Sequence, residues 1–195
     1  MRRGASASFG PRSGAVMSYP SPETIEVSTD GIQLLMKFLE RFLSEEEVER
    51  FGAMKPGDWV PLESVYPVWE SLVARIPEQM KAAIKGAVYA RMKVLEEIGA
   101  RSPADALRVS NILYQAFNRG PQLGGREVVQ EGPNEVIVDD SAWPGCRISP
   151  WFIEAFVRAF GARGVRLEHL DPCRGKGERF CRYRVRWTRV EPRSS

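Results

Sequence analysis

Apolar side chains recur at every third or fourth position through most of residues 30–117, the spacing that buries one face of an amphipathic helix. N-terminal capping residues separate these stretches, including Asp30, Ser44 and the pair Ser102-Pro103. The pattern therefore predicts successive helices over residues 30–43, 44–51, 62–76, 78–98 and 103–117.

After Gly120-Pro121 the hydrophobic period shortens to two residues, the period of a strand with one buried face. Strands are predicted over residues 126–130, 135–140, 165–171 and 179–190, with a helix over 149–160 between the two hairpins. In the last strand one face carries Cys181, Tyr183, Val185 and Trp187, and the other carries Arg182, Arg184 and Arg186. This order predicts an α+β fold, with N-terminal helices packed on a C-terminal antiparallel sheet built from two β-hairpins and an intervening helix.

Composition divides the chain into a tail and one domain. Residues 1–23 are rich in Gly, Ser, Pro and Arg, so we expect a flexible tail. Residues 24–191 are expected to form a single domain, with a helical half over 24–120 and a sheet half over 121–191. We find no signal-peptide pattern and no apolar run long enough to span a membrane, and a reducing cytoplasmic location is expected.

The soft metal ligands of the chain are concentrated near its C-terminal end. They are Cys146, His169, Cys173 and Cys181, and no other cysteine or histidine is present. Strand phase places His169 and Cys181 on the inward face, with Cys173 at the adjoining turn and Cys146 in a loop. Four such ligands can hold a structural zinc ion. Two other interpretations stay open: cysteines packed as small apolar residues, and a disulfide between Cys173 and Cys181.

The same segment carries a resemblance to a known family. The strand VRLEHLDPC and the run CRGKGERFCRYRVRW resemble the C-terminal signature of 4-vinyl reductase domains, a Cys-x3-Gly-x3-Cys-x-Phe/Tyr pattern met by Cys173, Gly177, Cys181 and Tyr183. That group of ligand-binding folds includes haem-based nitric oxide sensors and subunits of the Golgi transport (TRAPP) complexes. The chain is also similar to myxobacterial proteins of unknown function.

The resemblance implies a zinc ligand set of Cys146, position 170, Cys173 and Cys181. Position 170 is Leu here, which cannot bind a metal, so His169 or the alternative Asp171 would supply the fourth ligand. We do not expect haem, because His169 lies in a different segment from the helix-borne ligand of the haem sensors.

A ligand pocket between the helices and the sheet is a second expectation from the resemblance. Its predicted lining residues are Trp69, Tyr89, Met92, Tyr114, Trp143, Phe152 and Phe156. The alternative is that these aromatic residues simply fill the core.

These observations favour a non-enzymatic small-molecule-binding or sensory module with a structural zinc site. A small apolar or aromatic molecule would be its ligand. No catalytic motif is present, and the alternating arginines of the last strand are interpreted as a solvated face, so no nucleic acid is expected. The alternative function is a protein–protein interaction module without a ligand, acting as a homodimer or with another protein.

Overall fold

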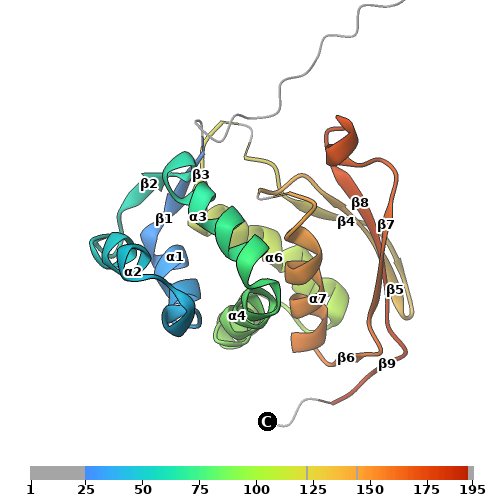
Figure 1. Cartoon of the computed structure of the whole chain (residues 1–195). Helices are drawn as coiled ribbons and strands as arrows, with labels where there is room; N and C mark the ends of the chain where they lie inside the picture. Colours follow the sequence, from blue (N-terminus) through green and yellow to red (C-terminus); the bar gives the residue numbers. More distant parts are fainter. Residues whose placement is uncertain (1–24, 122, 144, 193–195) are drawn as a thin grey trace, which may run out of the picture.

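A computed structural model describes residues 25–121, 123–143 and 145–192 of the chain (Figure 1). The expected flexible tail of residues 1–23 lies outside these described residues. The fold is α+β, with the helices preceding the main sheet, as the sequence pattern predicts.

The helical half begins with α1 and ends with α6. Its helices are α1 (Thr29–Met36), α2 (Glu45–Gly52), α3 (Leu62–Arg75), α4 (Pro77–Tyr89), α5 (Met92–Glu97) and α6 (Pro103–Phe117), with a 3-10 turn at Glu40–Phe42. Capping boxes start α2 and α6: the hydroxyls of Ser44 and Ser102 accept from backbone N–H groups, and Glu47 and Asp105 accept in return.

The prediction of a single helix over residues 78–98 is wrong, because the chain forms α4 and α5 with a break at Ala90-Arg91. The Arg91 N–H bonds to the carbonyl of Val88, which tightens the chain into a turn. The guanidinium of Arg91 then lies 4.0 Å above the ring of Phe117 on α6. A continuous apolar stripe does not reveal a turn of this kind, because both helices bury the same side.

The main sheet has the strand order β4-β5-β8-β7, and every neighbouring pair is antiparallel. Its strands are β4 (Arg126–Gly132), β5 (Glu135–Asp140), β7 (Arg166–Leu170) and β8 (Cys181–Arg186), and α7 (Ser149–Ala159) connects the hairpins. The predicted strand over residues 179–190 is therefore shorter than expected, since β9 (Arg189–Val190) leaves to pair with β6 (Ala162–Arg163).

A second small sheet, not predicted, has the order β2-β1-β3. It is formed by β1 (Glu26–Ser28), β2 (Trp59–Pro61) and β3 (Asn118–Arg119). Strands of two or three residues carry no measurable periodicity, so the sequence pattern could not indicate them. This sheet connects the two ends of the helical half, since β1 precedes α1 and β3 follows α6.

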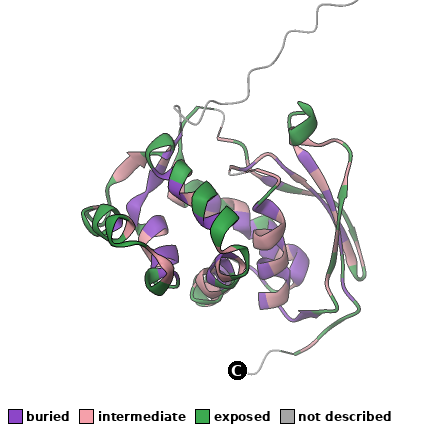
Figure 2. Ribbon diagram, in the orientation of Figure 1, coloured by how far each residue is buried: buried purple, intermediate pink, exposed green. Residues whose placement is uncertain are grey.

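The core lies between the helices and the inner face of the main sheet (Figure 2). Val136 and Val138 of β5 pair with Val185 and Tyr183 of β8, and all four are 0% exposed. On the outer face, Arg182 forms two hydrogen bonds to Asp139, at 2.6 and 2.7 Å. The alternation predicted for the last strand is thus confirmed within β8.

None of the described helices combines the length and apolar character needed to cross a lipid bilayer.

Candidate functional site

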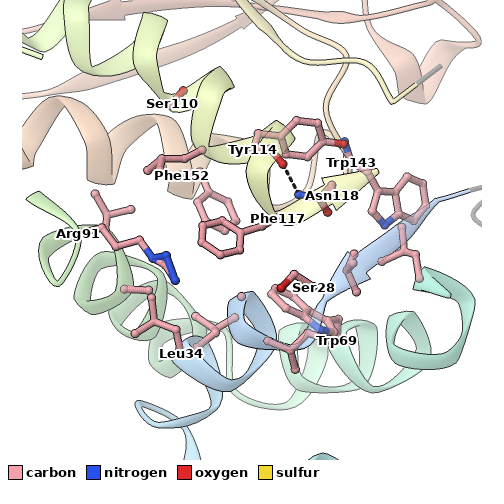
Figure 3. Close-up of a pocket in the computed structure, with 18 of the residues that line it drawn as sticks. Ser28, Leu34, Trp69, Arg91, Ser110, Tyr114, Phe117, Asn118, Trp143 and Phe152 are labelled. Atoms are coloured by element: carbon pink, nitrogen blue, oxygen red, sulfur yellow. Dashed lines mark hydrogen bonds between the residues drawn. The ribbon is translucent and has the colours of Figure 1, made fainter. Parts of the chain in front are cut away.

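A cavity of about 180 Å³ lies between the helices, beside the start of β4 (Figure 3). It is bounded by β1, α1, α3, the end of α4, α6, α7 and the loop after β5, and its walls are predominantly apolar. Typical lining residues are Ile32, Leu35, Val65, Leu113 and Phe117.

Five of the residues predicted to line a pocket do border this cavity: Trp69, Tyr114, Trp143, Phe152 and Phe156. The other two do not. Tyr89 is 39% exposed on the outer side of α4, where Lys85 lies over its ring. Met92 is half-buried and packs on the core. Tyr89 belongs to the exposed side of α4, whereas Met92 begins α5 after the break at Ala90-Arg91.

Tyr114 fixes one end of the cavity to the loop after β5. Its hydroxyl donates to the carbonyl of Leu123 at 3.0 Å and accepts from the backbone N–H of Trp143 at 2.9 Å. The Tyr114 carbonyl accepts from the side-chain amide of Asn118, which also borders the cavity (Figure 3). This network holds the Trp143 backbone in place beside the cavity.

Arg126 and Asp140 form a buried ion pair at the start of β4. The Arg126 Nε lies 3.0 Å from an Asp140 carboxylate oxygen, and the two side chains are 4% and 1% exposed. The second Asp140 oxygen accepts from the N–H of Ala142. The Arg126 guanidinium lines the cavity and lies 5.6 Å from the centre of the Phe152 ring. This pair was not predicted from the sequence, although Arg126 and Asp140 stand directly opposite each other in the hairpin.

Two glycines make this arrangement possible. Gly124 has a φ of +75°, and a Cβ there would lie 2.3 Å from the carbonyl oxygen of Ser141. A Cβ on Gly125 would meet the Asn111 amide oxygen, which accepts from the Arg126 N–H at 3.1 Å. The backbone at these two glycines lies close to Ser141 and Asn111, and this close packing directs Arg126 toward the cavity.

Several hydrogen-bond donors of the described cavity wall lack a partner. The indole N–H groups of Trp69 and Trp143 are buried and have no hydrogen-bond partner among the described residues. The Arg91 side chain also lines the cavity. Among the described residues it forms no hydrogen bond or ion pair. In Figure 3 the Arg91 guanidinium points toward Phe117. The described lining contains no carboxylate.

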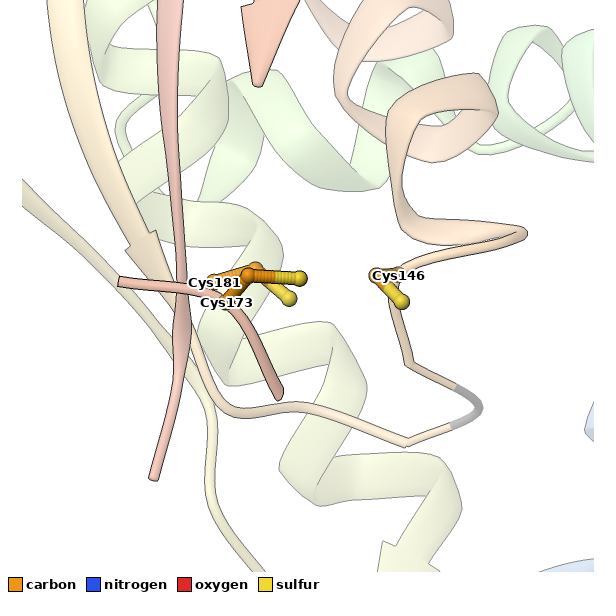
Figure 4. Close-up of side chains that lie close together, drawn as sticks. All are labelled: Cys146, Cys173 and Cys181. Atoms are coloured by element: carbon orange, nitrogen blue, oxygen red, sulfur yellow. The ribbon is translucent and has the colours of Figure 1, made fainter. Parts of the chain in front are cut away.

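A cluster of three cysteines lies near the other end of the loop after β5 (Figure 4). The sulfur atoms of Cys146, Cys173 and Cys181 are all within 4.8 Å of one another, and all three are free thiols. Cys181 is buried and the other two are half-buried. Burial raises the pKa of the Cys181 thiol to about 11, although a hydrogen bond from the Arg174 backbone N–H acts in the opposite direction.

The structure does not bring His169 or Asp171 into this cluster. His169 shares a sheet face with Tyr183 and stacks on its ring at 4.7 Å, but it is exposed because β7 is an edge strand. Asp171 is also exposed and pairs with Lys176 at 2.7 Å. The predicted fourth ligand is therefore missing from the group of metal-binding side chains that the described residues assemble.

Arg174 ties the turn that follows Cys173 to the loop after β5. Its Nη1 donates to the carbonyls of Ser141 and Ala142, at 3.2 and 2.8 Å. Trp143 borders the cavity and Cys146 belongs to the cysteine cluster, so two residues three positions apart belong to different sites.

Comparison with known proteins identifies the fold. No protein-family model matches the sequence, and no curated protein matches it. Among solved structures, the Fe(II) unliganded H-NOX protein from K. algicida matches with a TM-score of 0.57 at 9% identity, covering 86% of this chain and 100% of that one. A mutant H-NOX from T. tengcongensis matches with a TM-score of 0.57 at 10% identity, covering 84% and 98%. The chain shares the fold of these proteins.

This likeness supports the resemblance at the level of the fold. The likeness to 4-vinyl reductase domains, TRAPP subunits and myxobacterial proteins stays a prediction. The expectation that haem does not belong here is contradicted, because a further match with a TM-score of 0.56 and 10% identity comes from work on haem distortion in H-NOX proteins. That expectation rested on the sequence position of one histidine, whereas the whole fold carries the likeness.

Haem iron in proteins is held by at least one axial side chain. The described lining of the cavity includes no histidine, cysteine or methionine, the side chains that most often hold haem iron. Tyrosine is another known iron ligand, and Tyr66 and Tyr114 are present, but both hydroxyls are hydrogen-bonded. Burial raises the pKa of both phenols, that of Tyr66 to about 12. The described lining does not fit an iron-ligated haem.

Proposed function

We propose that this chain is a non-enzymatic binding module that holds one small, largely apolar molecule in the cavity bounded by α1, α3, α6 and α7. The observation that carries the proposal is the cavity itself, with a volume of about 180 Å³ and predominantly apolar walls. An engineered protein cavity of roughly 150 Å³ binds benzene. The size therefore suits one substituted aromatic ring or an aliphatic molecule of similar volume.

Unpartnered polar groups in the wall support a ligand that can accept hydrogen bonds. Buried donors in native proteins nearly always have a partner, and leaving one unpaired costs about 1–3 kcal/mol. The indole N–H groups of Trp69 and Trp143 are two such donors. A ligand with an acceptor atom within reach of either indole would remove this cost on binding.

The proposed role is sensory, and the common fold with H-NOX proteins supports it. The ligand-dependent element would be the segment of residues 141–143, because Trp143 borders the cavity and Arg174 holds Ser141 and Ala142 to the last hairpin. The output would be a change of that segment read by a partner protein.

The three cysteines are proposed to hold a zinc ion as a structural clamp. With Zn–S bonds of about 2.3 Å, two sulfurs on one tetrahedral ion lie about 3.8 Å apart. The sulfur atoms already lie within 4.8 Å of one another, so a small closing movement would suffice. Water or an exogenous group would occupy the fourth position, and Cys146, Cys173 and Cys181 would tie the loop before α7 to the turn between β7 and β8.

Native mass spectrometry of the purified full chain tests both parts. We expect one small organic molecule per binding unit, released on collisional activation, and a mass increment of one zinc ion. Leu113→Trp, which fills the cavity from α6, should abolish the organic adduct. Ile112→Trp is the matched control, because Ile112 is 52% exposed on the same helix and does not line the cavity.

Three results would redirect the proposal. A stable homodimer or heterocomplex without any small-molecule adduct would favour the interaction module. An intense haem absorption band in the purified protein would identify haem as the occupant. Equal adduct levels in Leu113→Trp and wild type would show that the molecule binds elsewhere.

A further inference from the structure

Arg91 is the one charged side chain of the described cavity wall that lacks a close partner of opposite charge. It lies in the turn between α4 and α5, half-buried, with its guanidinium 4.0 Å above the Phe117 ring. Burial lowers the pKa of Arg91, and the charge of Asp30 offsets this only in part. The protein thus keeps a partly desolvated cation beside an apolar space.

The nearby acids do not contact the Arg91 guanidinium closely. An Asp30 oxygen accepts from the backbone N–H of Gly57 at 3.0 Å, and the Asp30 charge acts on Arg91 without a salt bridge. Asp140 is occupied by Arg126 and by the N–H of Ala142. With no carboxylate in the described lining, the cavity has an excess of positive charge that its own wall does not neutralise.

We propose that the ligand is a small aromatic carboxylate, with its acid group on the Arg91 guanidinium and its ring in the apolar part of the cavity. This inference rests on the proposed binding function and names the chemical class of the ligand. A guanidinium presents paired N–H donors that match the two oxygens of a carboxylate. A dianionic phosphate would bring more charge than one guanidinium neutralises, so we commit to the monoanion.

The face of Arg91 that stacks on Phe117 does not compete with this role. A guanidinium bonds in its plane and stacks through its face, so one side chain can cover a ring and bind a carboxylate together. The ring of the ligand would then lie among Phe117, Phe152 and Phe156, all of which border the cavity.

Isothermal titration calorimetry with two matched pairs of probes tests the inference: benzoate against benzamide, and phenylacetate against phenylacetamide. Each pair has nearly the same shape and differs in charge. Because a hydrogen bond to a charged group contributes about 1.5–3 kcal/mol, we expect each acid to bind wild type roughly tenfold to hundredfold more tightly than its amide. Added salt should weaken acid binding and leave amide binding nearly unchanged.

Variants of Arg91 test whether this side chain causes the preference for the acids. Arg91→Met should remove the preference for the acids while amide binding persists, and Arg91→Lys should retain part of it. Arg50→Gln is the matched control for a lost positive charge, because Arg50 is exposed on α2 and remote from the cavity lining. Circular dichroism checks that each variant is folded; if Arg91→Met does not fold, Arg91→Lys and the salt dependence decide.

The outcomes separate this inference from the proposed function. Acids and amides binding wild type equally would overturn the inference and leave the proposed function standing. An acid preference that survives in Arg91→Met would also overturn it. If none of the four probes binds wild type and cavity filling has no effect on native adducts, the proposed function itself fails.

Discussion

At the scale of single residues, Arg126 and Asp140 form a buried ion pair at the wall of the cavity. The two side chains are almost completely buried, and Asp140 also accepts from the N–H of Ala142. Removing one member of such a pair leaves a buried charge without compensation, which costs far more than the intact pair contributes. The neighbouring pair Arg182–Asp139 offers a natural comparison, because it lies on the outer sheet face.

Asp140→Asn should lower the free energy of unfolding by about 3–5 kcal/mol, because it leaves Arg126 buried and unneutralised. Urea denaturation at pH 7 measures this change. Asp139→Asn is the matched control and should cost clearly less, about 1 kcal/mol, since Arg182 and Asp139 are 36% and 17% exposed and their pair keeps part of its contact with water. The double variant Arg126→Leu with Asp140→Leu should be less destabilised than Asp140→Asn; an equal loss in Asp139→Asn would contradict the argument.

Sequence reasoning identified the aromatic residues of the candidate cavity more readily than its charged ones. Trp69, Tyr114 and Phe152 were expected to line a pocket because the resemblance implies one between the helices and the sheet, and all three border the cavity. Arg91 lies within an amphipathic stretch, where an arginine is normally interpreted as solvent-facing. Only the turn after α4 brings it to the cavity wall, and no local pattern predicts that turn.

At the scale of elements, α2 shows how one carboxylate can serve both as a helix cap and as an ion-pair partner. Glu47 accepts from the Ser44 N–H at 2.7 Å and from Arg75 on α3 at 2.9 Å. Burial alone would raise the pKa of Glu47, but these hydrogen bonds outweigh it, so the pKa lies below its ordinary value of 4.5. The start of α2 is thereby attached to the end of α3.

Glu47→Gln should lower the free energy of unfolding at pH 7 by roughly 0.5–1 kcal/mol, the range of a helix cap with an exposed partner. A carboxylate whose pKa is lowered in the folded state stabilises the fold at pH values above its ordinary pKa of 4.5. This stabilisation is lost as the pH falls through the pKa of the folded state. The difference between variant and wild type should therefore shrink in acid. Parallel urea titrations at several pH values measure it, with exposed Glu46→Gln as control; a difference independent of pH would be inconsistent with this origin.

Long elements were predictable and short ones were not. The hairpins β4-β5 and β7-β8 and the helices α3 and α6 follow from sustained periodicity, and their order determined the fold class. The sheet β2-β1-β3 depends on pairings between residues up to 93 positions apart, such as Glu26 with Arg119. Pairing at that separation follows from the packed helices and leaves no trace in a local window.

At the scale of the whole molecule, the two candidate sites lie on either side of one loop. The cavity lies between the helices of the first half and α7, whereas the cysteine cluster joins the last hairpin to the start of α7. An ion held by three cysteines from separate segments stabilises the folded state by the free energy of its binding, since the unfolded chain does not assemble the site.

A strong chelator should therefore lower the melting temperature of the metal-loaded protein, and added zinc should restore it. Cys173→Ser and Cys181→Ser should each lower the melting temperature and abolish the chelator effect. Differential scanning fluorimetry with and without chelator measures both. Identical melting curves for the wild type under the two conditions, with zinc absent by elemental analysis, would remove the metal from the proposal.

The loop that carries both Trp143 and Cys146 has a consequence for the binding equilibria of the two candidate sites. If an occupant of the cavity and an ion on the thiols each favour one position of that loop, the two equilibria are linked, and the linkage is reciprocal. Whatever factor the metal applies to ligand affinity, the ligand must apply to metal affinity. A change in the available zinc would then change the affinity for the small molecule. Saturation with the small molecule would in turn change how readily the thiols release their metal or become oxidised.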